Sequence, residues 1–205
     1  MTAGIMTAVY PAPPVDKREV LRYAGAKTLD KATALLLDEC IALAKDAFSY
    51  RVAYAVYPIL QTENGLSRGF FETASQDLCK NLSGCERAVA LCATVGQGID
   101  RLVLKESLVS PARSLLLDAL GTERVEALVD VFCAELARKY AREGCALHPR
   151  FSPGYGDLPL SVQKPLFSAL DLPRKIGVSL NDSLLMTPKK SVTAFVGIQK
   201  AKELL

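Results

Sequence analysis

The stretch RVAYAVYPILQTENGLSRGFF, residues 51–71, decides the fold class, because it predicts a strand, a turn and a returning strand. Apolar residues, many of them β-branched or aromatic, occupy both faces of 51–57, which is typical of a buried strand. Pro58 ends this strand, since proline cannot donate to the ladder of a central strand. TENG (62–65) turns the chain, and LSRGFF (66–71) can pair back as a second strand.

Further strands are predicted in the middle and at the end of the chain. ERAVALCATVG (86–96) predicts a buried strand, and RKIGVSLND (174–182) and SVTAFVGI (191–198) predict two closing strands. Strands that alternate with helices and include a hairpin favour an α+β fold over a doubly wound parallel sheet. We therefore expect a mixed, largely antiparallel sheet packed with helices.

The chain is expected to form a single domain over residues 1–205, because no linker or internal repeat divides it. Within this domain, residues 1–15 are predicted to form an extended N-terminal arm. The reason is that Pro11, Pro13 and Pro14 oppose both a helix and a central strand.

Start and stop signals define the first helices. Asp16 is a predicted N-cap with Glu19 three residues on, and Gly25 ends that helix. Ser75 begins a short helix. Thr28 begins a longer one, whose apolar residues recur at spacings of three and four: Leu29, Ala32, Leu36, Cys40, Leu43 and Ala47.

Two more helices are predicted on either side of Gly121, one beginning at Ser110 and the other capped by Thr122. A short helix over 162–170 follows, with Pro165 in its first turn. The helix after Thr122 carries the clearest apolar stripe in the chain, formed by Val125, Leu128, Val129, Phe132, Cys133, Leu136 and Tyr140.

Composition and charge exclude several classes of function. Half of the residues are hydrophobic and 23% are charged, as in a soluble globular protein. A net charge of +3 is too mild for a nucleic-acid partner, and no apolar run reaches the roughly 18 residues that span a membrane. MTAGIMTAVYPAPP (1–14) lacks the features of a secretory signal. We expect a cytoplasmic protein with no nucleic-acid or membrane partner.

The sequence predicts no metal-ligating and no catalytic residue. The 6 cysteines form no C-x-x-C pair and lie mostly in apolar segments, as reduced core thiols do. His148 is the only histidine, which excludes a two-histidine metal site, and no nucleophile elbow accompanies it. ATVGQGID (93–100) carries two glycines, but Arg101 replaces the third glycine of a dinucleotide motif, so a tight turn is favoured.

The candidate site is the loop HPRFSPGYGDLPL, residues 148–160. SPGY (152–155) has proline second and glycine third, the pattern of a type II turn. Arg150 and Tyr155 could then project toward one place, with the amides of Gly154 and Tyr155 still reachable. A guanidinium suits a carboxylate, and a phenol can stack on a base. The residues alone leave two interpretations open: a ligand site, or a rigid turn with a salt-bridged arginine.

This loop, followed by IGVSLNDSLLMTPKKSVTAFVGI (176–198), resembles the activation (reactivation) domain of cobalamin-dependent methionine synthase. The segments 13–25, 93–100 and 116–130 are similar to short, stand-alone members of that family, so the resemblance covers most of the chain. R-x-S-P-G-Y is its most specific motif. In that family an arginine, a small residue and Pro-Gly-Tyr form the core of the S-adenosylmethionine site.

The resemblance implies a role for each of five residues. Arg150 would bind the methionine carboxylate of S-adenosylmethionine, Ser152 would offer backbone contacts, and Gly154 and Tyr155 would line the ligand. Glu126 would lie near the positive end of the ligand. Helical geometry agrees, because Glu126 falls at the margin of the apolar stripe, where a side chain borders both core and cleft.

The resemblance also implies a function. The chain would be an accessory subunit of methionine synthase, a methyltransferase, and would act in trans on a cobalamin-carrying chain. One electron from a flavodoxin-like or iron–sulfur donor, coupled to methyl transfer from S-adenosylmethionine, would convert inactive cob(II)alamin to methylcobalamin. The corrinoid would arrive on the partner, because the D-x-H-x-x-G signature is absent: His148 is followed by proline.

One departure and two alternatives accompany this interpretation. Few residues follow AFVGI (194–198) in the sequence, so we expect the family's longer C-terminal segment, which carries another ligand-side tyrosine, to be absent. The first alternative is a non-catalytic docking or chaperone partner of a corrinoid protein. The second is an activator of a different corrinoid methyltransferase.

Overall fold

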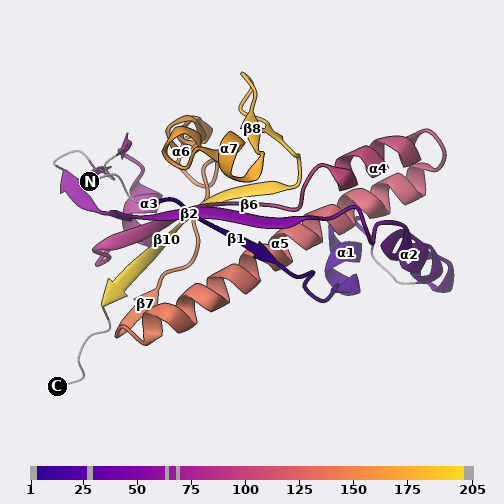
Figure 1. The fold of residues 1–205 in the computed structure, drawn as a ribbon, viewed down its shortest axis with the longest axis horizontal. Coiled ribbons are helices and arrows are strands. Elements are labelled where there is room, and N and C mark those ends of the chain that lie inside the picture. Colours follow the sequence, from indigo (N-terminus) through magenta and orange to yellow (C-terminus); the bar gives the residue numbers. More distant parts are fainter. Residues whose placement is uncertain (1–3, 27–29, 63–64, 68–69, 201–205) are drawn as a thin grey trace.

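The computed structural model describes residues 4–26, 30–62, 65–67 and 70–200. Its centre is a five-stranded sheet in which all neighbouring strands are antiparallel. Helices pack on both faces of this sheet (Figure 1), which confirms the predicted α+β class. The strand order is β1 (Met6–Tyr10), β2 (Tyr50–Pro58), β6 (Arg87–Thr94), β10 (Ser191–Lys200) and β7 (Cys145–Leu147).

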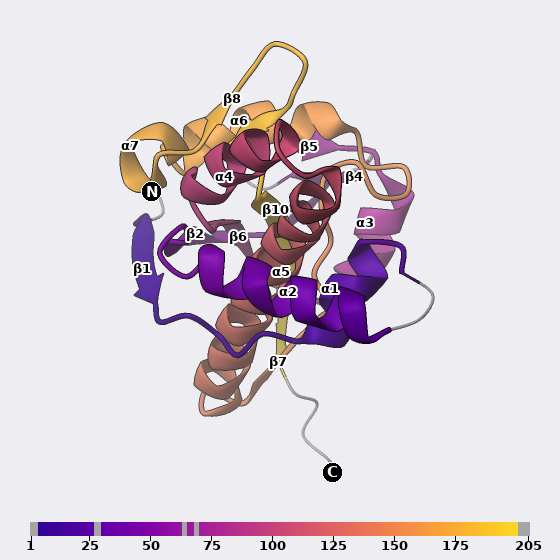
Figure 2. The ribbon, with the colours of Figure 1, turned by 90° about the vertical axis from the view of Figure 1, so that its right-hand side faces the viewer.

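The helices form two layers, and each layer encloses a hydrophobic core against the sheet (Figures 1 and 2). The first core is lined by α1 (Lys17–Tyr23), α2 (Lys31–Leu43), α4 (Gly98–Ser107) and α5 (Pro111–Ala141). The second is lined by α3 (Gln76–Asn81), the 3-10 turn Leu160–Val162, α6 (Gln163–Ala169) and α7 (Leu172–Ile176). β6 is buried on both faces because its alternate residues point into opposite cores.

The predicted turn after β2 does return the chain, but into a separate small sheet. There β4 (Gly65–Ser67) pairs with both β3 (Leu60–Thr62) and β5 (Glu72–Thr73). β2 itself pairs with β1 and β6, so the returning segment is not its partner. Residues 63–64 of the turn and 68–69 of the returning segment lie outside the described residues.

α5 is one continuous helix of 31 residues, so the predicted break at Gly121 is wrong. Gly121 is buried in mid-helix, where a Cβ would lie 2.9 Å from Lys190 Cγ and 3.2 Å from Ile99 Cγ1. Thr122 does not cap a helix, and its hydroxyl donates to the Asp118 carbonyl at 3.1 Å. The glycine therefore serves the close approach to α5 of α4 and of Lys190, the residue before β10. It does not end a helix.

Other helix signals are confirmed. Ser75 and Ser110 each accept a backbone N–H as the N-caps of α3 and α5, and Pro165 lies in the first turn of α6. The predicted stripe of α5 packs into the first core, with only Cys133 half-buried.

α2 differs from its prediction in start and phase. Its N-cap is Asp30, whose carboxylate accepts the Thr33 N–H at 2.7 Å, while Thr28 and Leu29 lie outside the described residues. Leu43, predicted to be in the stripe, is 48% exposed. The buried residues are Leu37, Cys40 and Ala44. The buried face of the helix is therefore rotated by about one residue position from the predicted stripe.

Two segments predicted to be extended can now be described, and the second differs from its prediction. Residues 6–10 of the predicted arm form the edge strand β1, because the prolines follow the strand and so leave its ladder intact. Residues 174–176 belong to α7, which ends at Gly177 with φ 70°. The closing strand is therefore only β8 (Ser179–Leu180), which pairs with β9 (Met186–Thr187).

A buried ion pair on α5 holds the N-terminal segment in place. Arg124 is 1% exposed, pairs with the adjacent Glu123, and donates to the carbonyls of Pro13 and Pro14, the latter at 2.7 Å. Glu123 in turn accepts the Asp16 N–H at 3.0 Å. This contact replaces the predicted capping box of α1.

The Asp16 carboxylate still caps α1, accepting the N–H groups of Arg18 and Glu19. The Glu19 side chain, however, turns to Arg22 and does not return to the Asp16 N–H. α5 therefore determines where α1 begins.

Arg124→Ala is expected to destabilise the protein by about 3–5 kcal/mol, because it leaves a buried carboxylate without its counter-ion. Urea unfolding measures the change, with the exposed Arg138→Ala on the same helix as the matched control. A loss below about 1 kcal/mol would show that the pair does not hold the segment.

Candidate functional site

The loop predicted as the site continues the edge of the main sheet. After β7, the His148 N–H donates to the Gly197 carbonyl at 2.9 Å. Phe151 and Phe195 then exchange two backbone hydrogen bonds of 2.8 Å each. Because successive side chains point to opposite faces, Phe151 packs on the second core while Arg150 faces α5. The arginine is thus placed by backbone pairing on both sides of it.

The type II turn over 152–155 is confirmed. The Tyr155 N–H donates to the Ser152 carbonyl at 3.1 Å, and Gly154 has φ 91°, which favours glycine. The Gly154 N–H donates to the Leu158 carbonyl at 2.9 Å. The prediction that the amides of Gly154 and Tyr155 stay reachable is therefore wrong, because both hydrogen bonds are used within the loop.

Asp157 fastens the far end of the loop to α3. Its carboxylate accepts the Ser75 hydroxyl, the Gln76 N–H at 2.7 Å and the Asp77 N–H at 3.3 Å. The hydrogen bond from Ser75, with help from these amides, holds the pKa of Asp157 below its usual value. Gly156 is required beside it, since a Cβ there would lie 2.3 Å from Asp77 Oδ2.

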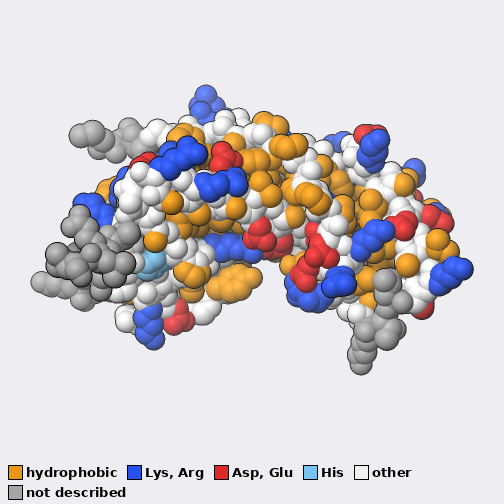
Figure 3. All heavy atoms as spheres, turned by 90° about the horizontal axis from the view of Figure 1, so that it is seen from below, with side chains coloured by type: hydrophobic (Ala, Val, Ile, Leu, Met, Phe, Trp, Pro, Cys, Tyr) orange, Lys and Arg blue, Asp and Glu red, His pale blue; other side chains and the backbone are white. Residues whose placement is uncertain are grey.

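A cleft of about 620 Å³ opens beside the loop. Four of the five predicted site residues line it: Glu126, Arg150, Ser152 and Tyr155. Gly154 does not line it and contributes the positive φ of the turn instead. Figure 3 shows one face of the molecule with a hollow in its outline and acidic and basic side chains beside it. The structure thus brings the predicted arginine, glutamate and tyrosine to one cleft.

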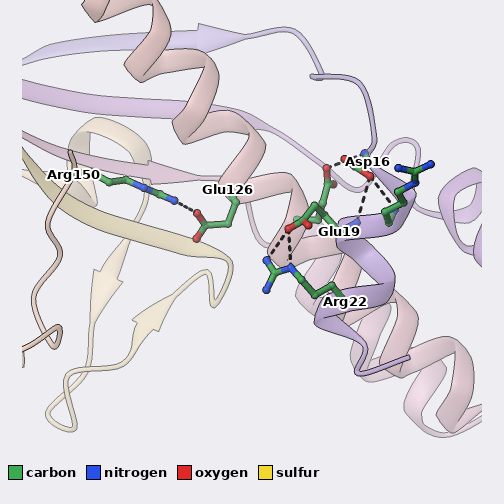
Figure 4. A network of polar contacts seen from close by, with 7 residues as sticks. Asp16, Glu19, Arg22, Glu126 and Arg150 are labelled. Carbon is green, nitrogen blue, oxygen red and sulfur yellow. Dashed lines mark hydrogen bonds and ion pairs between the residues drawn. The ribbon is translucent and has the colours of Figure 1, made fainter. Parts of the chain in front are cut away.

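Arg150 and Glu126 form an ion pair within the cleft (Figure 4). Their side chains are 33% and 29% exposed, so both are accessible from the cleft. Partial burial opposes the charge of Arg150, but the hydrogen bond and charge of Glu126, with Asp130 nearby, outweigh it and raise the arginine's pKa. In the structure as it stands, the arginine is held by a carboxylate of the protein.

A second recess of about 370 Å³ adjoins this pair and shares Tyr23, Glu126 and Arg150 with the cleft. Its wall is acidic, with Asp16, Glu19, Glu123, Glu126 and Asp130. The only basic residue among its lining residues is Arg150. Glu19 and Glu123 are already paired with Arg22 and Arg124, so the negative charge beside Glu126 that would favour a cation comes mainly from Asp16 and Asp130.

Sequence reasoning missed several residues of the cleft, which are Arg22, Tyr23, Thr122, Gln163, Met186, Ser191, Val192 and Thr193. Arg22 lies in the last turn of α1, donates to Glu19 and stacks over Tyr23 at 4.2 Å. The capping signal of α1 predicted this helix but not the face that it presents. The position of α1 beside the cleft depends on the contacts of Glu123 and Arg124 described above.

The other singled-out motifs are structural. His148 contacts the Asn81 carbonyl and the Gln199 side chain through its two ring nitrogens. In the GQG turn, a Cβ on Gly98 would lie 2.4 Å from the Ala47 carbonyl oxygen, and one on Gly96 would lie 2.3 Å from Ser49 Oγ. The predicted tight turn is therefore confirmed, because protein atoms fill the space that a phosphate would need.

The described residues contain no helix long and apolar enough to cross a bilayer. They also contain no group of three His, Cys, Asp or Glu residues arranged to hold a metal ion.

Comparison with known proteins identifies the fold. No family model and no curated protein matches the sequence. Among solved structures, the chain is similar to the crystal structure of the MetH reactivation domain bound to AdoHcy, with a TM-score of 0.67 and 14% sequence identity. The match covers 95% of this chain and 78% of that chain. The chain has the fold of that reactivation domain, as its resemblance predicted.

Asp157→Asn is expected to lower the melting temperature at pH 7, because an amide is a weaker acceptor for the three donors of α3. The folded-state pKa of Asp157 is lowered, so its contribution is present above the unfolded value of about 3.9 and is lost as the pH falls through the folded value. The gap between wild type and variant should therefore begin to narrow near pH 4 and should close only below the folded-state pKa.

Thermal scans from pH 7 to pH 2.5 test this, with the exposed Asp182→Asn as the matched control. A gap that is the same at every pH would contradict the anchoring role of the carboxylate.

Proposed function

We propose that this chain binds S-adenosylmethionine in the cleft and docks on a cobalamin-carrying methionine synthase chain for reductive remethylation of cob(II)alamin. The observation that carries the proposal is the accessible Arg150–Glu126 pair beside a rigid Ser-Pro-Gly-Tyr turn. It lies on a fold shared with a reactivation domain that was crystallised bound to AdoHcy.

The cleft suits this ligand in size and charge. Pockets for ligands of this size measure roughly 300–1,000 Å³, and the cleft measures about 620 Å³. S-adenosylmethionine carries a carboxylate, an ammonium and a sulfonium at one end. The carboxylate can take the place of Glu126 on Arg150, while the cationic groups meet the freed glutamate and the acidic recess. One ion pair of the protein is then exchanged for two charge contacts with the ligand.

Tyr155 is 69% exposed at the cleft, on the far side of the turn from Arg150. An exposed ring in this position can cover the nucleoside by stacking. Ser152 lines the cleft, and its carbonyl already accepts the Tyr155 N–H. We propose that the turn orients the ligand through Tyr155 and the wall that Ser152 and Pro153 provide.

The role of this chain would be positioning. The sulfonium is an activated methyl donor, so the residues need only bind it and exclude misaligned poses. The corrinoid and its chemistry belong to the partner chain. A flavodoxin-like or iron–sulfur protein supplies the single electron that the change from cob(II)alamin requires, and AdoHcy remains as the product. We place this complex in the cytoplasm.

A second candidate function has one observation in its favour. Glu126 already neutralises Arg150, as in a purely structural ion pair. The chain would then bind no nucleoside. It would be a docking or chaperone partner of a corrinoid protein, from methionine synthase or another methyltransferase. Ligand binding by the isolated chain separates the two candidates.

Arg150→Ala is expected to weaken binding of S-adenosylmethionine about ten- to a hundredfold, since it removes a charge-assisted hydrogen bond of about 1.5–3 kcal/mol. Arg150→Lys should restore only part of the affinity, because an ammonium lacks the two-pronged geometry of a guanidinium. Calorimetric titration measures both, with and without the cobalamin-carrying chain.

Stability without ligand should change by no more than about 1 kcal/mol, because the Arg150–Glu126 pair is partly exposed. Arg174→Ala, on the exposed side of α7, is the matched control and should leave the affinity unchanged. A sharp fall in stability with unaltered ligand affinity would mean that Arg150 is structural, in favour of the second candidate.

A further inference from the structure

Gln163, the first residue of α6, has a buried side chain whose amide oxygen has no hydrogen-bond partner within the described residues. The residue is 4% exposed and lines the cleft. Within the described part of the chain, its Oε1 meets no hydrogen-bond donor. Three other buried side-chain atoms of the described residues also lack a partner, Arg51 Nε, Asn81 Oδ1 and Glu106 Oε2, but of these four residues only Gln163 lines the cleft. Leaving a buried polar atom without a partner is unfavourable, so a ligand that supplies the partner would be favoured there.

The wall around Gln163 differs from the wall around the ion pair. Arg22 and Glu126 come from α1 and α5, on the side of the first core. Phe151 and Met186, which also line the cleft, pack against the second core together with α6. The cleft therefore joins a charged side to a side that is neutral and largely apolar.

A ligand with a zwitterionic end and a flat aromatic end matches this division. With the amino-acid end of the ligand on Arg150 and Glu126, the purine would lie against the neutral side. The apolar surface on that side comes from Phe151, Pro153 and Met186. Gln163 adds a side-chain amide to the same side of the cleft. The primary amide of glutamine carries an acceptor beside a donor. This matches adenine, which presents its 6-amino group beside a ring nitrogen.

We infer that Gln163 recognises the 6-amino edge of the adenine, with Oε1 accepting from the amine, and so makes the site selective for adenosyl ligands. The inference rests on the proposed function and adds the residue that reads the base. The last torsion of a glutamine is soft, so the amide can turn toward the base without a shift of α6. Gln163 is a binding residue and takes no part in methyl transfer.

The test compares two ligands on the wild-type chain and on Gln163→Leu. One ligand is AdoHcy, and the other is its 6-deamino purine counterpart, which lacks the amine but keeps the ring and the homocysteine end. The wild type should bind AdoHcy about ten- to a hundredfold more tightly than the counterpart, because the counterpart leaves Oε1 unpaired. Gln163→Leu should reduce this preference to less than about threefold, with AdoHcy affinity falling toward that of the counterpart.

The control is Gln97→Leu, which replaces an exposed glutamine before α4 and should leave the preference intact. Melting temperatures confirm that both variants fold, and the comparison on the wild type needs no variant. The inference is overturned if the wild type binds both ligands equally, or if Gln163→Leu keeps the full preference; the proposed function survives either result. If the wild type binds neither ligand, the proposed function falls and the inference falls with it.

Discussion

The arrangement of the cleft depends on the buried pair of Glu123 and Arg124 in the middle of α5. Arg124 binds the carbonyls of Pro13 and Pro14, and Glu123 binds the backbone of Asp16, where α1 begins. Breaking such a pair is strongly unfavourable once both charges are buried, so the segment before α1 has little freedom. Less than one helical turn further on, Glu126 meets Arg150 of the site loop. One short stretch of helix thus sets the position of α1, of the loop and of the cleft between them.

The site loop combines two kinds of rigidity. Backbone pairing with β10 fixes its beginning, and the carboxylate of Asp157 fixes its end to α3. Between these points the amides of Gly154 and Tyr155 are used within the turn, so these two N–H groups are not offered to a ligand. Preorganised side chains need little ordering on binding, and less of the interaction energy is then lost to entropy. The ion pair of Arg150 remains the one part of the loop that a ligand must rearrange.

The sequence predicted local features well and contacts between distant segments poorly. The type II turn followed from Pro153 and Gly154, because two residues with special backbone preferences determine it. Gly121 shows the limit: a glycine that ends a helix and a glycine that admits a neighbouring helix look alike until Lys190 and Ile99 are seen beside it. The reach of Arg124 to Pro13 spans 111 positions along the chain, and no local pattern encodes it. Four residues predicted by motif and resemblance line the cleft, whereas Gln163 becomes notable only through its unpaired oxygen.

The cleft lies at the start of β10, and residues that pack against each of the two hydrophobic cores line it. The layers on either side of the sheet are otherwise joined mainly through the strands themselves. A molecule bound in the cleft would link the two layers, because it would contact both at once. Its binding energy then opposes any opening that separates the layers, so an occupied cleft makes the whole domain behave as a more cooperative unit.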